Sequence, residues 1–154
     1  MSKSLLDYVK ARRGKRFRLR CVARCTVEVA LAKRLPESVV HTDILVLKDP
    51  LRHRVLWVGK TWRMPASLYT MLSQTKPLGR FIRDNMPESL GWRFFCYDAG
   101  DATYEFRHFI VHAIKPALNG YGELPDCYKT GGYLVALMER ELRKRRKRHF
   151  RVYW

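Results

Sequence analysis

The sequence predicts an α+β domain with a mainly antiparallel sheet. Residues 16–29 alternate between apolar and largely basic side chains, with the two-residue period of a β-strand. Other strand-like stretches follow, and few of them are separated by the long helices that connect the strands of a parallel sheet. A helical spacing of apolar residues appears near the C-terminus, over residues 133–148. We therefore expect residues 1–154 to form one basic α+β domain around one core.

The first half of the chain is expected to hold a short helix and three strands. Apolar residues on one side of residues 4–13 indicate the helix. The alternating stretch 16–29 is long for a strand, so we expect a bend or a bulge within it. β-branched residues indicate a second strand over residues 39–47, and a Lys-Asp-Pro turn separates it from a third strand over residues 55–62.

The second half is expected to hold a pair of short helices, a hairpin and the terminal helix. Pro65 stands where the first helix can begin, because the missing N–H of proline does no harm at the first helical position. Pro77 interrupts that pattern, and residues 78–82 begin the second helix. Residues 92–97 and 104–114 have the composition of two strands, and an Asp- and Gly-containing turn joins them into a hairpin.

Positive charge is the most unusual property of the chain. Lysine and arginine number 31 against 14 aspartates and glutamates, which gives a formal net charge of +17. A charge so far from zero opposes compaction and attracts polyanions, of which a phosphate backbone is the simplest. The candidate nucleic-acid-binding residues form one block near each end of the chain: Arg12, Arg13, Lys15, Arg16, Arg18 and Arg20, and then Arg143, Lys144, Arg145, Arg146, Lys147, Arg148 and Arg151.

The arrangement of both blocks favours phosphate groups as the partner. Arg16, Arg18 and Arg20 should project from one face of a strand about 7 Å apart, close to the spacing of phosphates along an extended nucleic-acid strand. Arginine outnumbers lysine, and the guanidinium group binds phosphate with two hydrogen bonds. Residues 143–154 form a basic extension of the last helix, where cations suit the negative end of the helix dipole. We expect a non-enzymatic nucleic-acid-binding protein, with DNA slightly favoured over RNA.

Other partners for the charge stay open. A basic cluster can also bind an acidic protein or an anionic membrane. The basic part of the last helix lacks a broad apolar face, and no apolar run approaches the roughly 20 residues of a membrane span, so we expect no membrane association. The first residues lack a hydrophobic signal segment, which predicts a cytoplasmic protein, or a nuclear one in a eukaryotic host. The sequence leaves the oligomeric state open.

Residues capable of metal or covalent chemistry lack the spacing that such chemistry needs. Cys21 and Cys25, like His108 and His112, are four residues apart, which is about 13 Å along a strand and too far for a shared zinc ion. The cysteines are expected to be reduced, partly buried thiols. The segment Gly59-Lys60-Thr61 resembles the end of a phosphate-binding loop, but Arg54 stands where that loop needs its first glycine. We therefore expect no metal, no cofactor and no catalytic residue.

The middle of the chain resembles the chorismate lyase and UTRA-like fold family. The resemblance covers about residues 39–116 and rests on two segments, Gly59-Lys60-Thr61-Trp62-Arg63-Met64-Pro65 and Thr75-Lys76-Pro77-Leu78-Gly79-Arg80-Phe81-Ile82. It implies a sheet with a pocket for a small carboxylate. The family uses an arginine on an early strand and a glutamate on the last one, and this chain has Thr42 and His112 near those positions. The resemblance thus implies a second possibility, a small-carboxylate-binding domain or degenerate enzyme with Thr42, Arg80 and His112 at its pocket.

Overall fold

The computed structural model describes residues 20–35, 44–60, 65–98, 114–119 and 124–152, with the side chains of residues 20, 60 and 144–152 left out of the description. Its centre is a four-stranded sheet in which each strand pairs antiparallel with its neighbours, in the order β1-β4-β2-β3. The strands are β1 (Arg20–Thr26), β2 (Ile44–Asp49), β3 (Arg54–Lys60) and β4 (Arg93–Asp98). The predicted α+β architecture with an antiparallel sheet is therefore confirmed.

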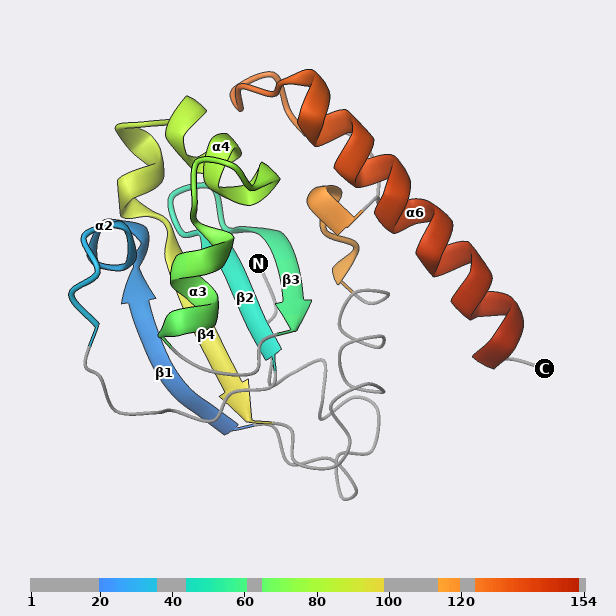
Figure 1. Cartoon of the computed structure of the whole chain (residues 1–154), viewed down its shortest axis with the longest axis horizontal. Helices are drawn as coiled ribbons and strands as arrows, with labels where there is room; N and C mark the ends of the chain where they lie inside the picture. Colours follow the sequence, from blue (N-terminus) through green and yellow to red (C-terminus); the bar gives the residue numbers. More distant parts are fainter. Residues whose placement is uncertain (1–19, 36–43, 61–64, 99–113, 120–123, 153–154) are drawn as a thin grey trace.

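The helices lie mostly on one face of this sheet. They are α2 (Val27–Leu31), α3 (Ala66–Met71), α4 (Pro77–Asp84) and α6 (Gly132–Val152), with short 3-10 turns η1 (Glu88–Gly91) and η3 (Ala117–Asn119). In Figure 1, α3 lies in front of the strands, α2 follows the end of β1, α4 lies near the upper end of the sheet, and the long α6 runs to one side. The predicted pair of short central helices and the C-terminal helix are thus present.

The core fills the space between the sheet and these helices. Leu47 on β2, Phe94 on β4 and Phe81 on α4 are buried in one core cluster. The ring of Phe81 lies 5.4 Å from that of Trp92 and 6.3 Å from that of Tyr128, measured between centroids. Burying large aromatic side chains is among the strongest contributions to folding. This cluster therefore fastens α4, β4 and the segment before α6 to one another.

The first strand is shorter than the alternation predicted. It ends at Thr26, and residues 27–31 are helical because the Thr26 hydroxyl accepts a hydrogen bond from the backbone N–H of Val29 at 3.3 Å. Threonine is a favoured N-cap, so this contact competes with continued extension. The expected irregularity is confirmed, because the pairing with β4 shifts by one residue between Cys21 and Ala23. The shift leaves Cys21 exposed, although the alternation placed it on the apolar side.

Several other predicted elements agree with the structure where it describes them, but the predicted hairpin of residues 92–97 with residues 104–114 is wrong, because β1 and β2 pair with the two edges of β4. The predicted Lys-Asp-Pro turn is also misplaced, since Lys48 and Asp49 still belong to β2. Pro65 is the N-cap of α3, and Pro77 occupies the first turn of α4. The predicted strand over residues 104–114 lies outside the described residues except for Ile114, which is helical and not extended. A proline follows two residues later, and alternation alone could not show that Ile114 is helical.

The outer edge of the sheet at β3 is closed by an asparagine side chain. Asn119, which is 2% exposed, donates from Nδ2 to the carbonyl of Val58 at 2.9 Å and accepts at Oδ1 from the N–H of Val58 at 2.8 Å. The side-chain amide thus replaces the backbone of a further strand. One position away, an ideal Cβ on Gly59 would lie 1.9 Å from the indole of Trp57, so the ring needs glycine at this position.

Replacing Asn119 with alanine should destabilise the fold, because the N–H and C=O of Val58 would lose their partner in a buried position. The expected loss is about 2–4 kcal/mol in the free energy of unfolding, measured by urea denaturation. Gln74→Ala is the control, because Gln74 is an exposed amide whose side chain has no hydrogen bond within the described part of the chain. Equal stability of the two variants would contradict the prediction.

Candidate nucleic-acid interface

Helix α6 gathers the C-terminal basic block on one continuous helix. It is 21 residues long, which corresponds to about 30 Å at 1.5 Å per residue. Its first half packs on the protein, since Leu134 is buried and Leu137 and Met138 lie against the core. Arg140 and Arg143 are exposed, and the helix continues through Val152 with its far end directed away from the sheet in Figure 1. The seven predicted C-terminal residues therefore share one element that is anchored at its other end.

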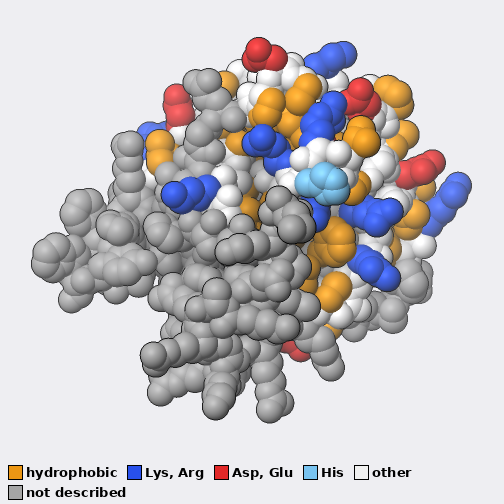
Figure 2. Space-filling model, turned by 180° about the vertical axis from the view of Figure 1, so that it is seen from behind, with side chains coloured by type: hydrophobic (Ala, Val, Ile, Leu, Met, Phe, Trp, Pro, Cys, Tyr) orange, Lys and Arg blue, Asp and Glu red, His pale blue; other side chains and the backbone are white. Residues whose placement is uncertain are grey.

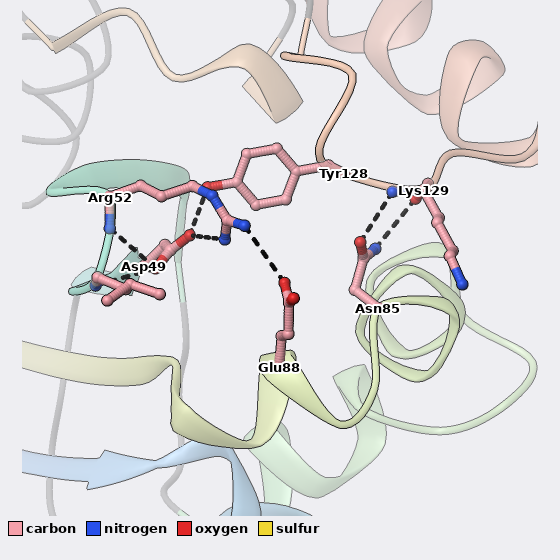
Figure 3. Close-up of polar contacts among 7 residues, drawn as sticks. Asp49, Arg52, Asn85, Glu88, Tyr128 and Lys129 are labelled. Atoms are coloured by element: carbon pink, nitrogen blue, oxygen red, sulfur yellow. Dashed lines mark hydrogen bonds and ion pairs between the residues drawn. The ribbon is translucent and has the colours of Figure 1, made fainter.

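The segment that leads into α6 is held by two side chains from distant parts of the chain. The Tyr128 hydroxyl donates to Oδ2 of Asp49 at 2.5 Å. Asn85 contacts the backbone of Lys129 at both polar groups, donating to its carbonyl at 3.0 Å and accepting from its N–H at 2.8 Å. Figure 3 shows both contacts beside one another. They fix the backbone immediately before the helix begins.

Asp49 is the centre of this network. It is 1% exposed, and it accepts hydrogen bonds from the backbone N–H groups of Leu51 and Arg52 as well as from the Arg52 guanidinium at 3.0 Å. Arg52 also contacts Glu88 at 3.3 Å and lies over the Tyr128 ring at 5.1 Å. Burial acts to raise the pKa of Asp49, but the hydrogen bonds from Tyr128 and Arg52 outweigh it, and the pKa is lowered. The carboxylate is therefore charged throughout the neutral range.

The first turn of α6 is held by Tyr133. Its hydroxyl donates to Asp84 of α4, and the guanidinium of Arg80 lies 5.3 Å from the centre of its ring. Burial and the bond to Asp84 raise the pKa of Tyr133 to about 12, so this hydroxyl keeps its proton at neutral pH. Arg80 also donates from Nε to the carbonyl of Gln74 at 3.0 Å. Contacts from α4 thus set the direction of α6 relative to the sheet.

Of the three residues predicted for the carboxylate pocket, the structure describes only Arg80. Arg80 is exposed and engaged with Tyr133 and Gln74, while Thr42 and His112 lie outside the described residues. A pocket of about 230 Å³ does open between α2 and α3, where Lys33, Tyr69 and Arg83 contribute to its lining. Its lining does not include Arg80. The carboxylate-binding site stays a prediction.

The N-terminal block can be placed only at its end. Arg20 opens β1, and the other predicted residues lie outside the described ranges: Arg12, Arg13, Lys15, Arg16 and Arg18. In the C-terminal block the side chain of Arg143 is exposed on α6. The backbone of the remaining six is helical: Lys144, Arg145, Arg146, Lys147, Arg148 and Arg151.

A further group of cations was not singled out from the sequence. Arg24 on β1, Lys48 on β2 and Arg93 on β4 come from three neighbouring strands, and Lys48 stands directly opposite Arg93. Figure 2 shows several Lys and Arg side chains gathered on the back of the molecule. Only the strand register brings these residues together, because they are far apart in the sequence and lie in otherwise ordinary strands.

All four cysteines are free, and Cys21 and Cys127 are exposed, so the prediction of partly buried thiols holds for only two of the four. Cys96 is buried, and burial raises the pKa of Cys25 to about 11, so its thiol is protonated and a poor nucleophile at neutral pH. Among the described side chains, no three His, Cys, Asp or Glu residues are grouped as metal ligands. No helix in the described ranges is long and apolar enough to cross a membrane.

Comparison with known proteins adds no relative. No protein-family model matches the chain, no curated protein matches it significantly, and no solved structure does so either. The resemblance to the chorismate lyase and UTRA-like family therefore stays a prediction. What this protein does must follow from its own residues and their geometry.

Stability should fall in acid because of Asp49. A carboxyl group with a lowered pKa in the folded state contributes stability above its unfolded pKa of about 3.9, and this contribution is lost as the pH falls through the folded value. Asp49→Asn should lose about 2 kcal/mol at pH 7 and show a flatter dependence on pH below about pH 4. Urea denaturation at several pH values measures both effects. Parallel curves for the two proteins would show that Asp49 does not carry the acid sensitivity.

Proposed function

We propose that this protein binds nucleic acid without catalysing a reaction, and that it grips the phosphate backbone with α6 and the N-terminal basic segment. One observation carries the proposal: six consecutive basic residues, 143–148, continue a helix whose other end is fastened to the core. DNA is slightly favoured over RNA, as expected from the sequence. A cytoplasmic location, or a nuclear one in a eukaryotic host, belongs to the same proposal.

The geometry of a helix supports a polyanionic partner. Successive residues turn by about 100°, so six consecutive cations surround the axis and cannot all face the protein. From Arg143 to Arg151 the block extends about 12 Å along the helix at 1.5 Å per residue. The major groove of B-DNA is about 12 Å wide and admits one α-helix. A basic helix held firmly at one end can therefore present its free end to a groove or to a phosphate backbone.

The cost of this charge in the free protein also favours such a partner. Arg143 and Lys147, and likewise Lys144 and Arg148, are four residues apart on the helix. Like charges at that spacing destabilise a helix by about 0.2–0.5 kcal/mol for each pair. The basic end of α6 therefore opposes its own folding until anions neutralise it. A bound phosphate backbone supplies those anions along the whole block.

Neutralising the basic end of α6 should weaken binding to nucleic acid and reduce its salt dependence. The test variant changes residues 144–148 to glutamine, which is a good helix former. If about six phosphates are neutralised, the intact protein should bind duplex DNA with a log–log salt slope of about −5, and the variant should lose most of that slope. Fluorescence anisotropy at about 50 and about 200 mM salt measures both.

The matched control removes the same number of charges from exposed positions elsewhere, with glutamine at Lys33, Arg34, Lys76, Lys115 and Lys129. If net charge alone governed binding, the control and the α6 variant would weaken equally. A flat salt response of the unchanged protein would contradict the proposed function. Strong binding to an acidic protein or to anionic vesicles, with none to nucleic acid, would assign the charge to that other partner.

Anions should also increase the helicity of α6. Adding duplex DNA, or raising the salt concentration, screens the repulsion between neighbouring cations, so the far-UV circular dichroism signal at the helical minimum should deepen. The 144–148 glutamine variant should already show the deeper signal and should not respond. A response of the same size in both proteins would mean that the additional helix forms outside residues 144–148.

A further inference from the structure

The back of the sheet carries three cations whose relative positions follow from the strand register. Lys48 on β2 is directly opposite Arg93 on β4, and Arg93 is opposite Thr26 on β1. Arg24 precedes Thr26 by two residues and therefore lies on the same face, diagonal to Arg93. Directly opposite side chains are about 5 Å apart at Cβ, and diagonal ones about 7–8 Å. The three basic side chains consequently extend from one small area of the sheet, and we call them the sheet cation cluster.

Local contacts do not explain this cluster. Arg24 and Arg93 are exposed and Lys48 is half-buried, and none of the three has an ion pair or a side-chain hydrogen bond to another described residue. The strand positions on this face that the structure describes contain no acidic residue, since the nearest acid along β2, Asp49, points to the opposite side and binds Tyr128. Like charges directly opposite on paired strands are destabilising. In the described part of the chain, no acidic side chain pairs with these cations to offset the repulsion.

An aromatic ring lies within the same group. Phe95 on β4 is directly opposite Arg24 on β1, and it is only half-buried. A partly exposed ring beside an arginine offers a surface on which an unpaired base can stack, while the arginine contacts the neighbouring phosphate. A base inside a duplex cannot reach such a ring. The combination favours a single strand over a double helix.

The cluster is separate from α6. Residues Leu47 and Phe94, which alternate with Lys48 and Arg93, face the core under α4, so the cluster occupies the opposite face of the sheet. Helix α6 packs against α4 and η3 on the core side. One short stretch of phosphates therefore cannot contact both the cluster and α6. A second copy of this chain is a poor occupant of the cluster, because each copy carries a net charge of +17.

We propose that the sheet cation cluster, Arg24, Lys48 and Arg93, is a second nucleic-acid site that binds the phosphates of a single strand, with Phe95 stacking on a base. This inference rests on the proposed function, because it assigns a second surface to the same class of ligand. The Cβ atoms from which these cations extend are about 5–8 Å apart, close to the separation of successive phosphates in an extended strand, about 6–7 Å. The protein thereby holds a single-stranded segment on the sheet and a further segment on α6.

The test compares full-length variants on single-stranded and duplex ligands. The cluster variant is Arg24→Gln with Lys48→Gln and Arg93→Gln, and the matched control is Arg34→Gln with Lys76→Gln and Lys129→Gln, which removes the same charge from exposed positions off this face. Binding to an oligothymidylate of about 16 nucleotides and to a duplex is measured by anisotropy at about 50 and about 200 mM salt. Phe95→Leu tests stacking separately, because it keeps an apolar side chain and removes the ring.

The cluster variant should lose about tenfold or more in affinity for the single strand, and its salt slope should shrink by about 2, which corresponds to three phosphate contacts on a single strand. Its affinity for duplex should match that of the control. Phe95→Leu should weaken single-strand binding without changing the salt slope. Because the three cations repel one another, the melting temperature of the cluster variant should equal or exceed that of the unchanged protein, which separates loss of binding from loss of folding.

Three results would overturn the inference in distinguishable ways. If the cluster variant and the control bind single strands equally, while the α6 variant still loses duplex binding, the second site is wrong and the proposed function stands. If the unchanged protein binds neither ligand, both fail together. Inorganic phosphate serves as a competitor: full displacement of the oligonucleotide at low millimolar phosphate would mean that the cluster takes free anions and not a strand.

Discussion

The buried carboxylate of Asp49 is the contact on which the arrangement of the other elements depends. It ends β2, closes the turn to β3 by accepting from two backbone N–H groups, and binds both Arg52 and Tyr128. A charge that is 1% exposed is tolerated only where hydrogen bonds surround it. Meeting that requirement brings together the β2–β3 hairpin, the turn at Glu88 and the segment before α6. A packing error in the hairpin or in the segment before α6 would remove part of the hydrogen bonding of this charge.

Two asparagines extend this principle to the backbone. Asn119 pairs with both polar groups of Val58, and Asn85 does the same for Lys129. A side-chain amide has the same donor and acceptor as a peptide unit, so each asparagine joins chain segments that share no secondary structure. The pairing at Val58 also covers part of an edge that could otherwise add a foreign strand. The chain has no other asparagine, so both copies of this residue serve the same purpose.

The sequence revealed the type of most elements but not how they meet. Alternation identified the strands, and prolines marked the starts of α3 and α4, because these signals are local. The end of β1 was misplaced, since Val27 and Val29 continue the apolar period and only the capping contact of Thr26 shows that the backbone turns helical. The basic end of α6 was visible as a run of charge. The sheet cation cluster was not, because its members meet only through the order β1-β4-β2-β3, which no local pattern contains.

Helix α6 behaves mechanically as a lever. Its fulcrum is the short region where Tyr133 meets Asp84 and where Leu134 enters the core, and its arm is the remaining length of about 25–30 Å. A rotation of about 5° at the fulcrum displaces the far end by about 2.5 Å, which is comparable to a hydrogen-bond length. The hydrogen bonds of Asn85 and Tyr133 thus determine the position of the basic side chains that lie several turns away. A substitution at the fulcrum can redirect the basic end without altering a single basic residue.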